Sequence, residues 1–213
     1  MLAGISHDLR TPLARLRLEA EMSVPDEQAR ELMAQDIEQV TDILDKFLDY
    51  ARLQNLNRQA LNMQSMLSHA LGPYSIMDQC QIELPPENEP TFVWANAVEF
   101  KRIVTNIFEN GLRYGRSADG VLRISCSLAK GPEHTTLSFE DHGPGVPPAV
   151  LSRLKDPFFR ADTARTAATG SGLGLAIVDK AMQRMGGELQ LAHGAHGGLK
   201  VTLSFETAPA PEA

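Results

Sequence analysis

Hydrophobic side chains at the start of the chain recur at spacings of three and four residues. This period predicts two amphipathic helices, each with an apolar stripe of the kind that forms a coiled-coil seam. The stripes consist of Ile5, Leu9, Leu13, Leu16 and Ala20 in the first helix, and Ile37, Val40, Leu44, Phe47 and Ala51 in the second. Between them, Pro25 interrupts helical hydrogen bonding, and Ser23 and Asp26 are candidate capping residues. We therefore expect residues 1–53 to form a helical hairpin.

A single hairpin of this kind cannot bury both of its apolar stripes. Two hairpins that pair into a four-helix bundle would cover all of them, so the pattern predicts a homodimer. The alternative is that the two helices pack against the rest of their own chain, and the spacing alone leaves that alternative open.

The pattern changes beyond residue 54 to short strands interleaved with helices. The expected helices lie near 65–77, 96–114 and 172–185, and the expected strands near 91–94, 121–128, 135–141, 188–193 and 199–205. This order predicts an α/β sandwich over residues 61–207. The polar stretch at 54–60 is the natural linker between the two domains, and residues 208–213 are expected to form a mobile tail.

Composition narrows the classes of partner. The 213-residue chain has a formal net charge of −7, the wrong sign for a protein that binds nucleic acid through its phosphates. Cys80 and Cys126 stand in no metal-ligand spacing, so free thiols are expected. No apolar run reaches the roughly 20 residues that a membrane helix needs. Residues 2–22 already read as a helix with no N-cap before it, so we expect a piece of a longer protein that meets a membrane only through a missing N-terminal part.

Polar side chains line one stripe of the predicted helix at 96–114. Asn106, Asn110 and Arg113 follow one another at intervals of four and three residues, which places them on one face beside an apolar stripe. Magnesium takes few protein oxygens and completes its shell with phosphates and water, so an asparagine carbonyl oxygen suits it. Solvated asparagines on a helix surface are the alternative, and this stripe alone favours that alternative.

The run DHGPG, Asp141 to Gly145, ends the predicted strand at 135–141. A carboxylate in this place can accept a hydrogen bond from an adenine amino group, while the glycines let the base approach the backbone. A tight turn capped by aspartate is the simpler interpretation of the run taken by itself.

A second glycine-rich run, GSGLGLAIV from Gly170 to Val178, leads into the predicted helix at 172–185. The amides and the dipole at a helix N-terminus suit a phosphate group. A dinucleotide-binding fold needs an apolar strand directly before such glycines, whereas the segment Thr163 to Thr169 is polar and is expected to be a flexible lid. The P-loop pattern that ends in Gly-Lys-Ser/Thr is missing, so an ATP site here must be of another kind.

Taken in order, these segments resemble the ATP-binding domain shared by histidine kinases, the Hsp90 chaperones, type II topoisomerases and MutL repair proteins. NIFEN (Asn106 to Asn110) is similar to the N box of that family, DHGPG to its G1 box, DPFFR (Asp156 to Arg160) to its F box, and GSGLG (Gly170 to Gly174) to its G2 box. The resemblance implies that Asn110 ligates Mg²⁺ and that Asp141 binds the adenine of ATP. It further implies nucleotide contacts by Asn106, Arg113, Tyr114, Gly143, Gly145, Phe158, Arg160, Arg165, Gly170, Ser171, Gly172, Leu173 and Gly174.

Two positions depart from the family pattern. Ser171 stands where threonine is common, and Gly111 stands where alanine is common. A glycine inside a helix costs about 1 kcal/mol relative to alanine. Neither departure removes a role that the resemblance implies.

The first helix selects one branch of the family, because SHDLRTPL (Ser6 to Leu13) is similar to the H box of histidine kinases. The resemblance implies that a neutral His7 accepts the γ-phosphoryl group of ATP and that Asp8 orients the ring and accepts its proton. It also implies a second activity, in which Thr11 positions a water that hydrolyses the phosphorylated partner. The helix and the lid are most similar to EnvZ-type osmosensor kinases, whose partner is an OmpR-like response regulator, and the implied location is the cytoplasmic side of a bacterial inner membrane.

The expected reaction is therefore in-line transfer from Mg-ATP to His7 and then to a regulator aspartate, with Arg160 and Arg165 screening the transferring phosphate. Two rival classes remain. An ATP-driven clamp of the chaperone or MutL kind would carry a glutamate four residues before the Mg²⁺ asparagine, where this chain has Asn106. A dimeric scaffold without enzymatic activity should have lost Asn110, Asp141 or His7, and all three are present.

Overall fold

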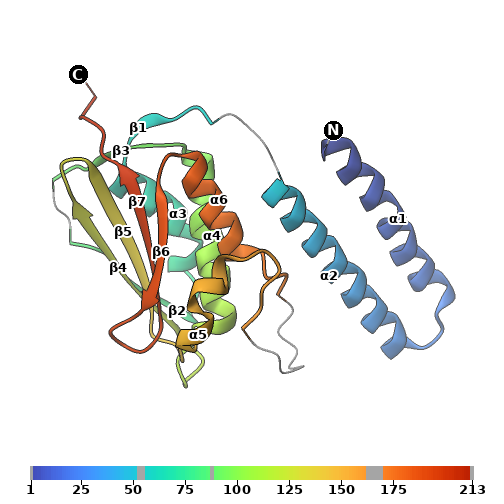
Figure 1. The fold of residues 1–213 in the computed structure, drawn as a ribbon. Coiled ribbons are helices and arrows are strands. Elements are labelled where there is room, and N and C mark those ends of the chain that lie inside the picture. Colours follow the sequence, from blue (N-terminus) through green and yellow to red (C-terminus); the bar gives the residue numbers. More distant parts are fainter. Residues whose placement is uncertain (1, 52–55, 87–88, 162–169, 212–213) are drawn as a thin grey trace.

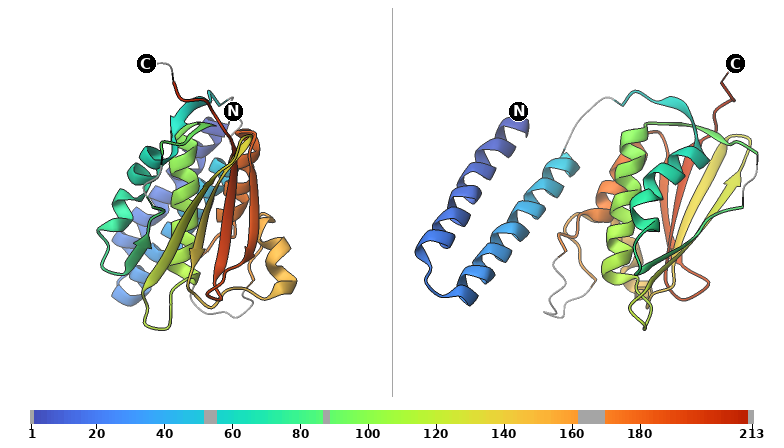
Figure 2. Two further views of the ribbon diagram at one scale, coloured as in Figure 1. Left: turned by 90° about the vertical axis from the view of Figure 1, so that its left-hand side faces the viewer. Right: turned by 180° about the vertical axis from the view of Figure 1, so that it is seen from behind.

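The chain folds into a helical hairpin followed by an α/β domain, as the computed structural model in Figure 1 shows. The structure describes residues 2–51, 56–86, 89–161 and 170–211, and it describes side chains from residue 8 onward. The hairpin consists of α1 (Leu2–Ser23) and α2 (Glu27–Ala51). Both helices lie on the side of the α/β domain that carries its other long helices (Figure 2).

Sequence pattern and local capping together explain the hairpin. Asp26 caps α2, because its Oδ1 atom accepts a hydrogen bond of 3.1 Å from the Gln28 N–H group. Ser23 does not cap α2 as expected but is the last residue of α1, and its hydroxyl donates to Glu19. The two helices are joined by an ion pair of 2.6 Å between the Arg10 guanidinium and the Asp45 carboxylate.

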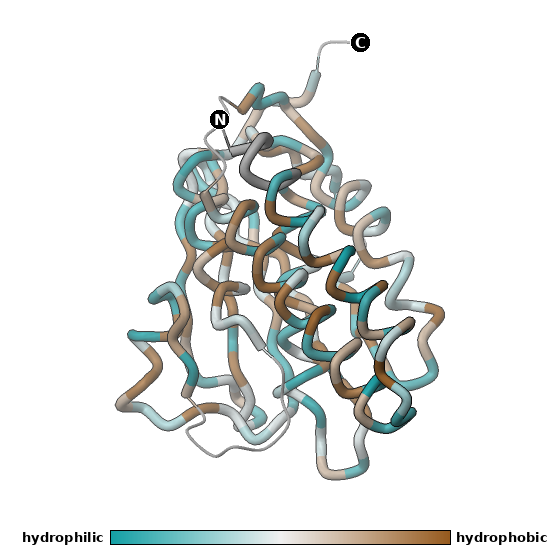
Figure 3. Tube along the Cα trace, turned by 90° about the vertical axis from the view of Figure 1, so that its right-hand side faces the viewer, coloured by the Kyte–Doolittle hydropathy of each residue, from teal (hydrophilic) through white to brown (hydrophobic). Residues whose placement is uncertain are grey.

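The described residues of the hairpin's apolar stripes are exposed or only half-buried in a single chain, apart from Ala20. Of the side chains described between residues 8 and 51, only that of Ala20 is buried. Leu16 is 57% exposed and Val40 is 50% exposed. Figure 3 views the molecule from the side of the hairpin and shows hydrophobic residues recurring along both helices. The single chain therefore leaves partly uncovered the stripes that the sequence pattern identified.

The α/β domain is a two-layer sandwich of helices on a mixed sheet, as expected. Its helices are α3 (Met63–Ser75), α4 (Ala97–Tyr114), the short α5 (Pro148–Leu151) and α6 (Gly174–Arg184), with a 3-10 turn, η1, at Ser152–Lys155. Its strands are β1 (Gln59–Asn62), β2 (Cys80–Glu83), β3 (Phe92–Ala95), β4 (Leu122–Lys130), β5 (His134–Asp141), β6 (Glu188–His193) and β7 (Leu199–Glu206). The main sheet has the order β2-β4-β5-β7-β6, in which β2 and β4 are parallel and the other neighbours are antiparallel. Helices α3, α4 and α6 cover one face of this sheet (Figure 2).

The core lies between these helices and the sheet, with aromatic rings at its centre. Phe108 of α4 packs against Tyr74 of α3, with ring centroids 4.5 Å apart, and edge-on against Phe139 of β5 at 6.0 Å. Asn96 caps α4, because its side-chain oxygen accepts the N–H groups of Val98 and Glu99 at 3.1 Å each. The cap and the packed rings fix α4, which carries the predicted polar stripe.

Several short elements differ from the expectation. Gln59 and Ala60, expected in the linker, belong to β1, which pairs with β3. Strand β2 and helix α5, each of four residues, were not expected. The expected tail also begins too early: the Ala208 N–H group donates to the Phe92 carbonyl at 2.8 Å and Ala208 is buried. The ordered chain therefore extends beyond residue 207.

Both cysteines are buried and free, as expected. None of the described helices combines the length and the apolar character needed to cross a bilayer.

Candidate functional site

A cavity of about 410 Å³ opens where the C-terminal half of α4, the end of β5 and the loop before α6 meet. The sequence-predicted residues that line it are Asn110, Arg113, Tyr114, Asp141, Gly145, Arg160, Gly170, Ser171, Gly172 and Gly174. Side chains from segments far apart in sequence thus converge on one concave surface, which is the usual form of a small-molecule site.

Other predicted residues support this cavity from behind or lie elsewhere. Leu173 is fully buried, and the Gly143 N–H group donates to Asp141. Asn106 lies on the same stripe as Asn110 but borders a neighbouring groove, where its amide nitrogen donates to the Arg102 carbonyl at 2.9 Å. Arg165 lies outside the described residues, as do the other residues of the predicted lid, Thr163 to Thr169.

Asp141 is a partly buried carboxylate that lines the cavity. Its Oδ1 atom accepts a hydrogen bond of 3.0 Å from the Gly143 N–H group. Burial raises the pKa of Asp141, and hydrogen bonds from the backbones of Gly143 and Leu199 offset only part of that rise. The carboxylate therefore keeps unsatisfied acceptor capacity in a partly desolvated position, where a ligand donor would be held strongly.

Two glycines that sequence reasoning missed enclose Asp141. A methyl group at Gly115 would lie 2.8 Å from the Asp141 Cγ atom, closer than real side chains approach. A methyl group at Gly198, in the loop between β6 and β7, would overlap the backbone oxygen and the carboxylate of Asp141. Both glycines come from segments distant in sequence, so no local motif identifies them.

A histidine pair fixes the loop that carries Gly198. The His196 backbone N–H group and ring Nδ1 lie 3.1 and 2.9 Å from Glu140 Oε1. Burial of the Glu140 carboxyl opposes its ionisation, but the hydrogen bonds from His196 outweigh burial and lower its pKa. The ring of His196 also stacks on that of His142, with centroids 4.3 Å apart. The loop is therefore anchored to the strand end on both sides of Asp141.

The glycine-rich loop before α6 lies against the polar stripe of α4. A methyl group at Gly174 would lie 2.9 Å from Asn110 Nδ2 and 3.0 Å from its Oδ1 atom, so glycine is what leaves room beside this amide. Gly174 is also the first residue of α6, whose N-terminal amides therefore begin at the cavity. Such a terminus has unpaired N–H groups and a positive dipole end, which together suit an anion.

The segment around Phe158 lies beside this loop and has a strained backbone. Phe158 is the one described non-glycine residue in the left-handed region, with φ of 65°. Its N–H group donates to the Gly172 carbonyl at 2.9 Å, and its ring stacks on Phe47 of α2 at 6.3 Å. Phe158 therefore contacts the hairpin, whereas the neighbouring Phe159 lines the cavity.

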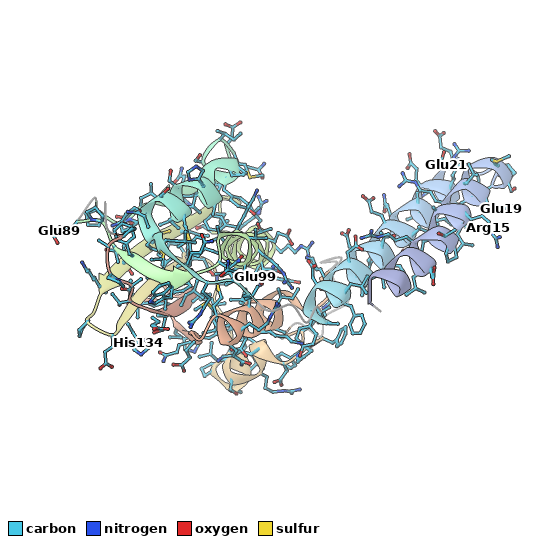
Figure 4. The ribbon with its side chains drawn as sticks, turned by 90° about the horizontal axis from the view of Figure 1, so that it is seen from above. Arg15, Glu19, Glu21, Glu89, Glu99 and His134 are labelled. Carbon is cyan, nitrogen blue, oxygen red and sulfur yellow. The ribbon has the colours of Figure 1, made fainter. Side chains whose placement is uncertain are left out.

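The hairpin contributes directly to this region. Lys46 of α2 lines the cavity, and its ammonium group lies 2.8 Å from the carboxylate of Glu109 on α4. The C-terminal end of α2 is held by Arg102 of α4, whose Nη2 atom donates to the Asp49 carbonyl at 2.5 Å. Arg102 also pairs with buried Glu99, which Figure 4 labels beside the α4 helix, far from the labelled residues of α1.

The predicted phosphoryl acceptor lies on the other helix of the hairpin. His7 is within α1, but its side chain lies outside the described part of the structure. Asp8 and Thr11 are exposed. Thr11 follows His7 by four residues, so helical geometry puts the two side chains on the same face.

Comparison with known proteins assigns both parts of the chain. Residues 95–209 match the family model of the histidine kinase-, DNA gyrase B- and HSP90-like ATPases, which is more than half of the chain. Residues 1–56 match the His Kinase A (phospho-acceptor) domain. The first model contains every residue that lines the cavity except Lys46, and the second contains Lys46 and His7.

Similar proteins carry both parts together. The sensor histidine kinase GtrS of Pseudomonas aeruginosa is 31% identical over 205 residues, covering 95% of this chain and 41% of GtrS. The sensor protein RstB of Escherichia coli K12 is 31% identical over 212 residues, covering 96% of this chain and 48% of RstB. This chain therefore spans about half the length of these relatives or less.

A solved structure shows the same fold over nearly the whole chain. Full-length ShkA in complex with AMPPNP is 21% identical, covers 99% of this chain and 47% of ShkA, and has a TM-score of 0.71. At this identity, the likeness concerns the fold alone. The two family models and the sensor-kinase relatives together assign the chain: it belongs to the sensor histidine kinases of two-component systems, with a His Kinase A domain followed by an ATPase domain.

Proposed function

We propose that this chain is the catalytic core that takes the γ-phosphoryl group of ATP onto His7 and passes it to an aspartate of a response regulator. One observation carries the proposal most: the cavity joins a partly buried carboxylate, Asp141, to the Asn110 amide and a glycine-rich helix N-terminus. These are acceptors for an adenine amino group and donors for phosphates, on one chain with a phospho-acceptor helix.

ATP fits the cavity in one orientation. Asp141 accepts a hydrogen bond from the adenine amino group, and Gly115 and Gly198 leave room for Asp141 at this place. The phosphates lie toward Gly174 and the start of α6. Asn110 lines the cavity, so its amide oxygen would be one ligand for Mg²⁺, and phosphate oxygens would supply further ligands. The ion would neutralise phosphate charge during transfer.

The transfer needs little covalent chemistry from the protein. An imidazole nitrogen of neutral His7 attacks the γ-phosphorus, the bond to the β,γ-bridging oxygen breaks, and ADP leaves with the electron pair. Asp8 accepts the proton that the ring loses on the opposite nitrogen. Arg160 lines the cavity and, with Arg165, screens charge on the transferring group. The phosphorylated ring then donates the group to the regulator aspartate.

The first prediction separates chemistry from binding. With γ-labelled ATP, the wild-type chain should acquire an acid-labile, base-stable label, and His7→Gln should lower labelling by at least about a thousandfold, since the nucleophile is lost. Nucleotide affinity in His7→Gln should stay within about twofold of wild type, because the cavity is built from α2 and the α/β domain. Labelling and affinity are measured on the same preparation.

Asn110→Ala is the matched binding variant. It should lose both Mg-ATP affinity and labelling while its circular dichroism spectrum and Tm stay close to wild type. Retained labelling in His7→Gln would remove His7 as the acceptor, and unchanged Mg-ATP affinity in Asn110→Ala would remove the metal role of Asn110.

The second prediction uses the raised pKa of Asp141. The ionised carboxylate accepts the adenine hydrogen bond more strongly than the protonated form. Because burial raises this pKa, protonation begins at a higher pH than for an exposed aspartate, and nucleotide affinity should fall as the pH falls through that raised pKa. Calorimetric titrations of an ATP analogue across acidic pH give the profile.

Asp141→Asn is the control. The phosphates of the nucleotide titrate in the same way with this variant, but the Asp141 carboxylate is missing. It should bind roughly tenfold more weakly at neutral pH, the scale of one charge-assisted hydrogen bond. It should also lack the Asp141 step in the profile. Identical pH profiles for both proteins would rule out adenine recognition by an ionised Asp141.

Exposed leucine and valine on the hairpin support a homodimer. Leu16 and Val40 belong to the predicted apolar stripes. In the single chain, Leu16 is more than half exposed and Val40 is half exposed. Pairing two hairpins would bury them in a four-helix bundle. Phe47, expected in the same stripe, already stacks on Phe158, so it tests the junction with the α/β domain rather than the dimer alone.

The third prediction follows from that stripe. Val40→Glu should convert the dimer to a monomer or unfold the hairpin, since an unpaired carboxylate in an apolar seam costs on the order of several kcal/mol. Gln39→Glu adds the same charge at an exposed neighbouring position and should stay dimeric. Multi-angle light scattering at micromolar concentration measures both. A folded wild-type monomer, or an unaffected Val40→Glu dimer, would contradict the proposed bundle.

The regulator belongs to the OmpR-like class in this proposal, and the kinase to the EnvZ-type branch, on the basis of the H-box segment and the residues before the lid. Because ATP is the phosphoryl donor, the reaction takes place on the cytoplasmic side of a bacterial inner membrane.

We further propose that Thr11 orients the water that hydrolyses the phosphorylated regulator. Its hydroxyl shares a helix face with His7, where the regulator aspartate must dock.

The fourth prediction distinguishes that role from a structural one. Thr11→Ala should lower dephosphorylation of a phosphorylated OmpR-like regulator by roughly tenfold, the scale of one lost positioning contact. Autophosphorylation should change far less, and Thr11→Ser should retain both activities. An equal loss of both activities together with a lower Tm would show that Thr11 stabilises the helix instead.

A further inference from the structure

Lys46 belongs to the hairpin but reaches the cavity of the α/β domain. It lines the cavity together with Asn110, and its side chain is 22% exposed, which is low for a lysine. Its ammonium group contacts the Glu109 carboxylate at 2.8 Å, and Glu109 directly precedes Asn110 on α4. The cation therefore lies at the part of the cavity that the proposed function gives to the phosphates.

A second groove, of about 300 Å³, continues from Lys46 between α2, α4 and α6. It is bordered by Lys101 and Arg102, and by Asp49 and Glu109. Arg102 is engaged with Glu99 and with the Asp49 carbonyl. Of the cations that border the groove, Lys46 also lines the nucleotide cavity, whereas Lys101 and Arg102 do not.

We propose that Lys46 is a nucleotide-binding residue that the hairpin supplies to the site of the neighbouring domain. This role of Lys46 rests on the proposed function, since it requires a nucleoside polyphosphate in the cavity. In the nucleotide complex the Lys46 ammonium leaves the Glu109 carboxylate and pairs with a phosphate oxygen. Glu109 thus holds the lysine in place and competes with the phosphate for it.

Charge balance supports this exchange. The Glu109 carboxylate lies next to Asn110, and a polyphosphate that enters the cavity adds several negative charges to the same region. A lysine ammonium has three donors on a flexible stem, so it can move from a carboxylate to a phosphate without a change in the backbone.

Fixed contacts on either side of Lys46 make the exchange efficient. The Asp49 carbonyl is held by Arg102, and the ring of Tyr50 lies 4.2 Å below the Lys180 ammonium. On the other side, Phe47 stacks on Phe158. The α2 backbone is therefore held at the cavity, and little entropy remains to be lost when Lys46 binds phosphate.

Linkage then gives a reciprocal effect. If docking of α2 raises the affinity for a triphosphate, a bound triphosphate must favour docking of α2 by the same factor. The nucleotide state of the α/β domain is thus transmitted to the hairpin that contains His7.

The test uses the full chain, Mg²⁺ and two probes, the ATP analogue AMP-PNP and adenosine, with affinities measured by calorimetry. Lys46→Met should weaken AMP-PNP binding about tenfold, the scale of one charge-assisted contact, and leave adenosine affinity unchanged. Lys46→Arg should restore AMP-PNP binding to within about threefold of wild type, because the charge is kept. Lys101→Met, which removes a charge from the groove but not from the cavity, should bind both probes as wild type does.

Glu109→Gln separates phosphate binding from simple docking. It removes the competitor and one negative charge, so AMP-PNP should bind about threefold or more tightly than to wild type, an order-of-magnitude expectation for one nearby charge. If Lys46 only pins α2 through Glu109, then Glu109→Gln and Lys46→Met would weaken binding equally, and the proposal would be overturned. If wild type binds AMP-PNP and Lys46→Met binds it with the same affinity, the role of Lys46 would also be overturned, while the proposed function would stand. A wild-type chain that binds neither probe would overturn both.

Discussion

The contact between the end of α2 and the start of α4 determines how the two domains can work together. Arg102 of α4 donates to the Asp49 carbonyl, one of the last four carbonyls of α2 that lack a partner within the helix. The same guanidinium pairs at 3.2 Å with Glu99, whose side chain is 6% exposed, and Arg184 adds a second cation at 4.0 Å. Removing Arg102 would leave the buried Glu99 charge with only the more distant Arg184, and breaking a buried ion pair typically costs about 3–5 kcal/mol.

This junction aligns the functional groups of α2 with those of both neighbours. Asp45 faces α1 and binds Arg10, which lies three residues after His7. The next residue, Lys46, faces the cavity, and Phe47 reaches the strained backbone at Phe158. One turn of α2 therefore contacts the phospho-acceptor helix, the phosphate end of the proposed ATP site and the segment that leads into the lid. Small movements of α2 would change its contacts with all three regions, because packed interfaces switch between discrete arrangements rather than deforming continuously.

Sequence reasoning succeeded where a pattern is long or local. The periodic hairpin, the polar stripe on α4 and the glycine-rich loop before α6 were predicted near their observed places, because each signal lies within one element. It failed for β1 and β2, short strands whose places are set by pairing with β3 and β4, and for the tail, where Ala208 is held by a hydrogen bond to β3. Gly115, Gly198 and Lys46 were also missed, because they reach the site only through tertiary packing and a single sequence contains no record of such contacts.

Hydrogen–deuterium exchange on the full chain, with and without AMP-PNP and Mg²⁺, tests most directly whether the hairpin and the ATPase domain form one nucleotide-dependent unit. The account predicts slower exchange on nucleotide binding in two places: around Asp141 and the loop before α6, and in the C-terminal half of α2 around Lys46. Local opening of α2 would become less frequent because bound nucleotide holds Lys46 and with it the junction. Protection around Asp141 with unchanged exchange throughout α2 would contradict the account.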